Sequence, residues 1–308
     1  MSQAEPVLVL FGPTAVGKTE LLERLIVDFP RLEVINADSM QVYRRMDIGT
    51  AKPSRQLQSR IPHHLIDIVD PDSQFSAGQF VRLAESLNRE LRLRGRLPVL
   101  CGGCAYYLRS FICGLPEAPA SDPQVRRKLK EQLREQGLEA LLEELGRVDP
   151  AARSAVAAGD THRIVRALEV YRCSGRALSS FANPDRPRPG YRFLLIGLHR
   201  ERQELYRRID ARVERMFHAG LAEEVRGLLD RGYGPEDPGL RGIGYREFLR
   251  MREGCQTLSE VREEVQRNSR RYAKRQITFF NSLPGVHWVP ADAEEQVARS
   301  IERFLSCP

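Results

Sequence analysis

A glycine-rich loop near the N-terminus of this chain is compatible with few folds. Residues 12–19 read GPTAVGKT and match the pattern G-x-x-x-x-G-K-[ST]. The loop follows the apolar run Val7–Phe11, which we predict as a strand, and precedes the amphipathic run TELLERLIVDF, which we predict as a helix. A strand and a helix joined in this way are typical of α/β proteins with a parallel sheet.

Such a loop is a socket for phosphate groups. Gly12 and Gly17 allow the backbone to wrap so that successive N–H groups point inward, and the helix N-terminus and Lys18 add positive charge. The Thr19 hydroxyl suits Mg²⁺, which prefers oxygen ligands. We therefore predict Thr19 as a metal contact and the following phosphate contacts: Gly12, Pro13, Thr14, Ala15, Val16, Gly17, Lys18 and Thr19.

The loop alone does not identify a reaction. Most proteins with this loop bind a nucleotide and hydrolyse it or transfer its terminal phosphoryl group. At this point ATP binding by a kinase or an NTPase remains the default interpretation.

The remaining β-rich runs give the expected organisation. Runs at Glu33–Asn36, Pro98–Cys101 and Phe193–Leu198 alternate with helical stretches, which predicts a parallel sheet covered by helices. The third and fourth runs are too far apart for one crossover, and the sequence between them has a helical leucine spacing. We expect a first part of the core at residues 1–115, an inserted helical subdomain at 116–190, and core completion with a helical C-terminal region at 191–308, including helices over 201–230 and 258–281.

Composition limits the class of protein. The 308 residues include 42% hydrophobic and 29% charged side chains, and no apolar run approaches the roughly 20 residues that span a bilayer. The N-terminal apolar stretch runs into the glycine loop, unlike a signal peptide, so we expect a cytoplasmic protein. The net charge of +7 permits a polyanionic partner, and six basic residues gather at 262–275, where a solvated helix face and a nucleic-acid contact are equally compatible with the pattern.

The cysteines include one CxxC pair, Cys101 and Cys104. Such a pair can bind metal or act in redox chemistry, but a structural zinc needs two further ligands, and no second paired motif supplies them. We therefore expect thiols at the end of a buried strand.

A second motif follows the second predicted strand. Residues 36–53 read NADSMQVYRRMDIGTAKP and place Asp38 at the C-terminal end of a strand that we expect to adjoin the P-loop strand. That edge of a parallel sheet carries the ligand site. Asp38 is therefore a candidate metal ligand through water or a candidate general base, and its position does not separate the two roles.

Six sequence blocks resemble bacterial tRNA dimethylallyltransferases in order and approximate spacing. They are GPTAVGKT, DSMQVYRRMDIGTAKP, PHHLIDIVDP, FSAGQF, GGCAYYLRSF and GLRGIGYREF, and the match runs from Phe11 to about Phe280. DIGTAKP has no role in generic kinases. The resemblance implies a P-loop kinase-like core and a P-loop that holds the diphosphate of dimethylallyl diphosphate, with Mg²⁺ as cofactor. An arginine of RRIDARVERM would close over the leaving group, with Arg212 as the first choice and Arg208 as the second.

The resemblance also implies the acceptor, an adenosine beside the anticodon of tRNA. The adenine must leave the stack of the anticodon stem-loop before its amine can react. Asp38 would accept the proton, and the inserted helical subdomain would contact the tRNA. The implied tRNA contacts are Asp38, Ser39, Met40, Gln41, Cys104, His162, Arg163, Ile164, Val165, Arg166, Arg241, Gly242, Ile243, Gly244, Tyr245, Arg246, Lys274, Arg275, Gln276 and Asn281.

Two residues depart from the family pattern, and three rival functions stay open. Cys104 stands where the family has Thr, and His162 where it commonly has Gln; a thiol is the weaker hydrogen-bonding group. The rivals are a small-molecule or nucleotide kinase, a transferase that prenylates free adenine nucleotides, and a non-catalytic RNA-binding protein. We expect a monomer that acts without a membrane.

Overall fold

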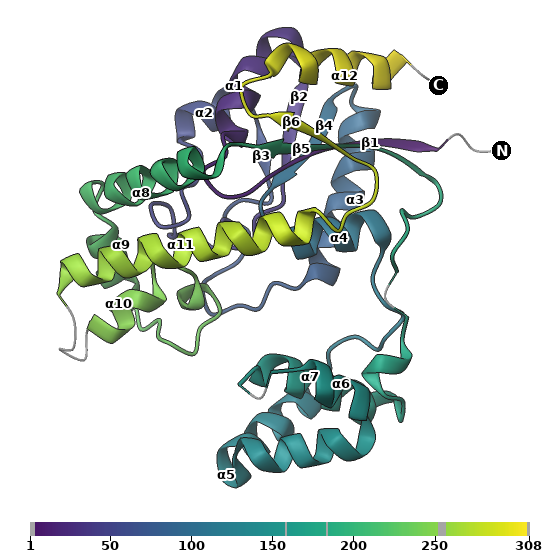
Figure 1. Ribbon diagram of the computed structural model, residues 1–308, viewed down its shortest axis with the longest axis vertical. Coiled ribbons are helices and arrows are strands. Elements are labelled where there is room, and N and C mark those ends of the chain that lie inside the picture. The colour runs from purple at the N-terminus through teal and green to yellow at the C-terminus, as the bar shows by residue number, and fades with distance from the viewer. Residues whose placement is uncertain (1–3, 158, 183, 252–256, 307–308) are drawn as a thin grey trace. The chain divides into compact units, whose positions relative to one another are not determined.

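The computed structural model describes residues 4–157, 159–182, 184–251 and 257–306. Its centre is a six-stranded parallel sheet in the order β3-β2-β4-β1-β5-β6 (Figure 1). This architecture confirms the predicted α/β class. The strands are β1 Glu5–Phe11, β2 Leu32–Asn36, β3 His63–His64, β4 Leu97–Gly102, β5 Tyr191–His199 and β6 Val286–Pro290.

Helices connect the strands and form most of the C-terminal region. The helix expected over 201–230 is two helices, because the chain turns at Ala219 and Gly220. The α-helices are α1 Lys18–Asp28, α2 Arg55–Arg60, α3 Ala77–Leu93, α4 Ala105–Cys113, α5 Pro123–Val148, α6 Pro150–Ala155, α7 Thr161–Ser174, α8 Arg202–His218, α9 Leu221–Leu229, α10 Arg246–Met251, α11 Leu258–Phe280 and α12 Glu294–Ser306.

The chain forms two compact units. One comprises Met1–Ile112 and Arg186–Pro308, and the other is Cys113–Asp185, close to the insertion expected at 116–190. In the second unit α5 packs against α7, and both contribute leucines to a core of their own, including Leu129, Leu141 and Leu168.

Glycine at the end of β4 permits an arrangement that the sequence pattern did not predict. Asp38 was expected beside the P-loop strand, but β4 lies between β2 and β1, so that expectation was wrong. A Cβ atom at Gly102 would lie 2.1 Å from the Ala37 carbonyl oxygen, so only glycine lets the chain after β2 cross the end of β4. The Cys104 N–H then donates to the Ala37 carbonyl at 3.0 Å, which holds this crossing in place.

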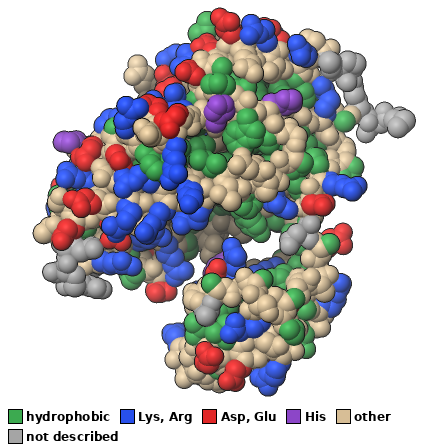
Figure 2. Space-filling view, in the orientation of Figure 1, with side chains coloured by type: hydrophobic (Ala, Val, Ile, Leu, Met, Phe, Trp, Pro, Cys, Tyr) green, Lys and Arg blue, Asp and Glu red, His purple; other side chains and the backbone are tan. Residues whose placement is uncertain are grey.

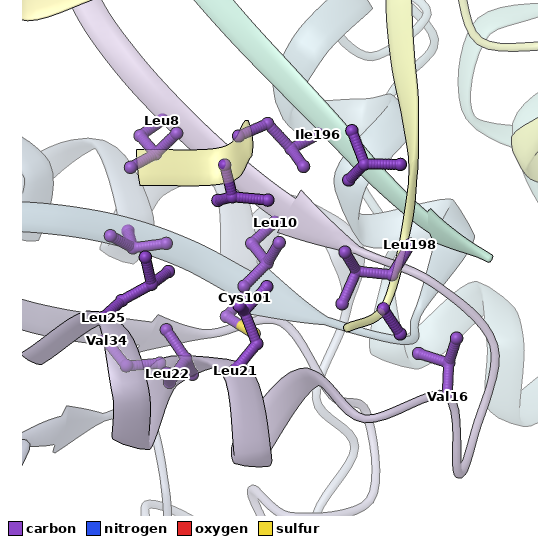
Figure 3. Packing of buried hydrophobic residues seen from close by; sticks show 14 of the residues in the cluster. Leu8, Leu10, Val16, Leu21, Leu22, Leu25, Val34, Cys101, Ile196 and Leu198 are labelled. Carbon is purple, nitrogen blue, oxygen red and sulfur yellow. The ribbon is translucent and has the colours of Figure 1, made fainter. Parts of the chain in front are cut away.

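An apolar core between β1 and α1 includes part of the P-loop. Leu8 and Leu10 of β1 pack with Leu21 and Leu25 of α1, and Val16 of the loop is fully buried in the same cluster (Figure 3). Cys101 also lies in this core, as expected for a thiol at the end of a buried strand. Burial of such side chains contributes about 1.5–3 kcal/mol each, so the loop rests on a rigid base.

The long helix α11 lies beside α8 (Figure 1). It begins with a capping box, in which the Thr257 side chain accepts from the Glu260 N–H and the Glu260 side chain accepts from the Thr257 N–H. Val261, Val265, Ala273 and Phe280 form its buried face. Among the described residues, none of the helices combines the length and the apolar character needed to cross a membrane.

Candidate active site

A cavity of about 1190 Å³ opens at the C-terminal edge of the sheet. Its wall combines the P-loop residues 14–20 and the segment 38–41 with the segments 47–55 and 241–244. Helices α8 and α11 complete the lining through Arg208, Arg212, Arg215, Tyr272, Arg275 and Gln276, among others. The six quoted blocks are separate in the sequence. The P-loop, the Asp38 segment and the GLRGIGYREF segment meet in the wall of this cavity.

The P-loop has the form of an anion socket. Helix α1 begins at Lys18 with no side-chain cap, so its first N–H groups have no helical acceptor. The Lys18 ammonium donates to the carbonyl oxygens of Gly12 at 2.9 Å and Pro13 at 3.0 Å. Gly12 and Pro13 are buried at the start of the loop, whereas the loop from Thr14 onward lines the cavity. Lys18 is therefore held against the start of the loop, on the side of the cavity that Thr14–Thr19 line.

Three arginines hold the outer side of the loop. Arg212 Nη1 donates to Thr14 Oγ1 at 2.9 Å, and Arg208 Nε donates to the Ala15 carbonyl at 2.9 Å. Arg208 also forms an ion pair with Glu20. Arg200, which the sequence did not single out, donates from Nε to the Val16 carbonyl at 2.7 Å. Arg208 is thus paired with a carboxylate, whereas Arg212 lines the cavity and bonds the Thr14 hydroxyl.

Lys18 and Arg212 are cations without a carboxylate partner within the described part of the chain. Burial lowers the pKa of both groups from their ordinary values, and the nearby Asp38 opposes this by raising each pKa. Desolvated charges of this kind favour an anionic ligand. The site therefore suits a diphosphate.

Gln276 of α11 joins the P-loop to the end of β4. Its Oε1 accepts from the Thr14 N–H at 2.9 Å, and its Nε2 donates to the Gly103 carbonyl at 2.7 Å. The side chain is only 4% exposed. Gln276 was predicted as a tRNA contact, and in the structure its amide bonds both of these loops while the residue also lines the cavity.

Asp38 lines the same cavity and lies near enough to Lys18 and Arg212 to raise the pKa of each. Its Oδ1 accepts from the N–H groups of Met40 at 2.8 Å and Gln41 at 3.3 Å, which fixes the carboxylate at the start of the segment. The Cys104 thiol forms a hydrogen bond with Ser39, and burial raises the pKa of this thiol to about 11. Cys104 therefore stays protonated near neutral pH.

The tRNA contacts expected in the C-terminal part divide into two groups. Arg241, Gly242, Ile243, Gly244, Arg246 and Arg275 line the cavity. Tyr245 is fully buried, and Lys274 and Asn281 are exposed outside the cavity lining. Arg241 and Arg246 form ion pairs with Glu236 and Glu247. Figure 2 shows Lys and Arg side chains gathered over α8 and α11, a face suited to a polyanion.

The segment 162–166 lies in the helical unit. Ile164 and Val165 pack in the core of that unit, so their side chains face inward. His162 and Arg163 are exposed, and Arg163 pairs with Asp160. Arg166 Nη1 lies 2.8 Å from the buried Glu169 carboxylate, which ties this arginine to the fold of the unit.

Helical periodicity could have identified further lining residues. Tyr272 lies in the cavity wall one helical turn from Ser269 and from Gln276, and all three share the inward face of α11 with Val265. Burial raises the pKa of the Tyr272 hydroxyl well above its usual range, and this hydroxyl forms a hydrogen bond with Gln276.

The chain matches a protein-family model described as IPP transferase over residues 41–283. The chain belongs to the IPP transferase family. It is 48% identical over 283 residues to a protein of Geobacter sulfurreducens named tRNA dimethylallyltransferase, covering 92% of this chain and 91% of the relative. A relative of that name from Pelotomaculum thermopropionicum is 40% identical over 312 residues, 99% of each chain.

Two solved structures of this family resemble the fold. The tRNA isopentenylpyrophosphate transferase of Bacillus halodurans shares 37% identity and a TM-score of 0.72, covering 98% of this chain and 97% of its own. A eukaryotic dimethylallyltransferase, described as acting on tRNA, shares 26% identity and a TM-score of 0.77, covering 98% of this chain and 78% of its own. The match to the IPP transferase model begins after the P-loop and Asp38, so it does not cover these residues.

The donor groups of the site fit Mg²⁺ only in part. Among the described residues there is no group of three His, Cys, Asp or Glu side chains that could hold a metal ion. The Thr19 side chain lines the cavity and is exposed. A Mg²⁺ ion that keeps several waters and shares phosphate oxygens needs few protein ligands, so Thr19 in this IPP transferase fits such an ion.

Proposed function

We propose that this chain transfers the dimethylallyl group of dimethylallyl diphosphate to the exocyclic amine of the adenosine next to the anticodon in tRNAs, with release of diphosphate. The observation that carries the proposal is that the P-loop and Asp38 open into one cavity with Lys18 and Arg212, two cations that form no ion pair with a carboxylate among the described residues. The names of the relatives from Geobacter sulfurreducens and Bacillus halodurans support the same reaction.

The reaction needs a stabilised leaving group. As the allylic C–O bond breaks, the diphosphate takes the electron pair, and negative charge gathers on its oxygens. Lys18, Arg212 and the first N–H groups of α1 stabilise that charge because they surround the socket. When bound at Thr19, Mg²⁺ supplies further positive charge to the diphosphate oxygens.

The acceptor amine needs a group that takes its proton. The lone pair of an exocyclic adenine amine is delocalised into the ring, so the amine is a weak nucleophile. It must lose a proton as the new C–N bond forms. Asp38 Oδ1 is held by two backbone N–H groups, and the carboxylate lies in the cavity wall. We assign the proton to this carboxylate.

The acceptor reaches the cavity as an unstacked base. A base within a stacked anticodon loop cannot present its amine to a buried carbon atom, so the base must leave the stack. The arginines of segment 241–246 and of α11 contact the phosphates around it. The protein would act as a monomer in the cytoplasm, where unmodified tRNA is available.

One experiment compares the proposed donor and acceptor with their rivals. Purified protein is incubated with Mg²⁺, labelled dimethylallyl diphosphate, and either unmodified tRNA or AMP. We expect label in tRNA and none in AMP. Label in AMP alone would instead identify a nucleotide prenyltransferase, and phosphoryl transfer from ATP without prenyl transfer would identify a kinase.

A further inference from the structure

The block Asp47–Pro53, DIGTAKP, lines the cavity but contributes no group to the proposed chemistry. Its first residues are hydrogen-bonded to Glu224 of α9, a residue outside the cavity lining. Glu224 Oε2 accepts from the N–H groups of Asp47 and Ile48, each at 2.8 Å. Glu224 Oε1 accepts from the Gly49 N–H at 3.1 Å. Three successive backbone N–H groups therefore donate to this one carboxylate.

The same carboxylate connects the block to the segment GLRGIGYREF. The Tyr245 hydroxyl donates to Glu224 Oε1 at 2.7 Å. A Cβ atom at Gly49 would lie 2.6 Å from the Tyr245 ring, so only glycine allows the block to lie against that ring. Successive N–H groups that converge in this way form an anion-binding nest, and here a side chain of the protein itself occupies it.

A second anchor holds the other end of the block. The Lys52 ammonium donates to the Tyr43 carbonyl and to the carboxylates of Asp47 and Asp67, each at 2.6 Å, and its side chain is 4% exposed. Between the two anchors lies Thr50. The block is therefore fixed on both sides of Thr50, whose carbonyl oxygen faces Arg212.

The Thr50 carbonyl oxygen accepts from Gln41 Nε2 at 3.1 Å and, at a longer 3.5 Å, from Arg212 Nη2. Arg212 in turn bonds Thr14 of the P-loop. A short chain of contacts thus runs from Glu224 through the block to the arginine over the leaving group and to the segment that begins at Asp38. Displacement of the block by about 1 Å is enough to lower a rate by about a hundredfold when it misaligns reacting groups.

We propose that Glu224 is a positioning residue for the transfer reaction: its carboxylate holds Asp47, Ile48 and Gly49 so that Thr50 keeps Arg212 and Gln41 aligned. The assignment rests on the proposed function for its effect on rate, but the anchoring itself can be tested without activity.

The test uses Glu224→Gln, which keeps the shape but replaces one acceptor oxygen by an NH₂ group that faces backbone donors. Glu223→Gln is the matched control, because Glu223 is an exposed neighbour on the same helix. Hydrogen exchange of residues 46–50 and the single-turnover rate with tRNA are measured in both. We expect faster exchange there with unchanged exchange in β1, and a rate lower by about tenfold to a hundredfold, in Glu224→Gln only.

The outcomes separate the two claims. Unchanged exchange at residues 46–50 in Glu224→Gln would overturn the assignment, as would faster exchange with wild-type kcat and KM. Faster exchange in a protein whose wild type transfers no prenyl group would overturn the proposed function and leave the anchoring supported. If Glu224→Gln does not fold, Gly49→Ala displaces the block from Tyr245 while keeping the carboxylate, and the same exchange and rate changes are expected.

Discussion

The backbone N–H of Thr14 donates to the Oε1 atom of Gln276, which lies 262 residues further along the chain, at 2.9 Å. The same amide group donates to the Gly103 carbonyl, so one side chain of α11 sets the distance between the P-loop and the end of β4. The P-loop near the N-terminus is therefore held in place by a residue of the C-terminal region.

Replacement of Gln276 by alanine removes both bonds and leaves the partly buried Thr14 N–H without its acceptor. We expect the KM for dimethylallyl diphosphate to rise about fivefold to tenfold, since one such bond contributes about 1 kcal/mol. Steady-state kinetics with each substrate varied in turn checks this. Gln266→Ala, on the same helix but bonded to Glu214, is the control. A change confined to the KM for tRNA would show that Gln276 acts on the acceptor instead.

Arg212→Lys keeps the charge but loses the fork that reaches Thr14 Oγ1 and the Thr50 carbonyl together. We expect kcat to fall by about 10²–10³, the cost of removing one donor that stabilises developing negative charge. Arg207→Lys changes an exposed arginine on the same helix, 75% exposed and paired with Glu204, and kcat should not change. Equal effects of the two substitutions would remove Arg212 from the leaving-group site.

Diphosphate binding should depend on the charge of Lys18. In the protein without ligand, burial lowers the pKa of Lys18 from its ordinary value of 10.5. A bound anion favours the charged form of the side chain and so raises this pKa. Affinity should therefore fall as pH rises through this lowered pKa, and binding near it should take up protons. Calorimetry with inorganic diphosphate in buffers of different ionisation enthalpy measures both quantities. Lys18→Met is the control, because protonation of the diphosphate itself affects binding to the variant and to the wild type alike. If the affinity of the variant depended on pH as that of the wild type does, the role of Lys18 would be contradicted.

The P-loop and the parallel sheet could be predicted because their signals are local. The glycine spacing, Lys18 and the apolar run before them lie within a few residues of one another. The short strand β3 at His63–His64 gave no such signal, and β6 at Val286–Pro290 is a partly exposed edge strand. The order of the strands could not be predicted either, because it depends on packing between distant segments. Asp38 reaches the cavity through the close approach of Ala37 to Gly102, a contact that no local pattern indicates.

The contacts that position the catalytic groups could not be read from the sequence. Gln276 and Arg200 form hydrogen bonds with the P-loop although they lie far from it in the sequence. Their distance along the chain follows no sequence pattern that would predict these contacts. Tyr245 was expected to contact tRNA from its place between glycine and arginine. Its burial against Gly49 depends on packing between two blocks that the sequence showed only as separate motifs.

The most direct test of the account is the product formed by the wild type and by Asp38→Asn from labelled dimethylallyl diphosphate and unmodified tRNA in one turnover. Asparagine keeps the oxygen that accepts from Met40 and Gln41 but cannot take a proton at neutral pH. We expect the wild type to yield a dimethylallyl adenosine beside the anticodon, identified by nucleoside mass spectrometry, and the variant to be slower by about 10²–10⁴ with unchanged binding of the diphosphate. A wild type without this product, or a variant as fast as the wild type, would contradict the account.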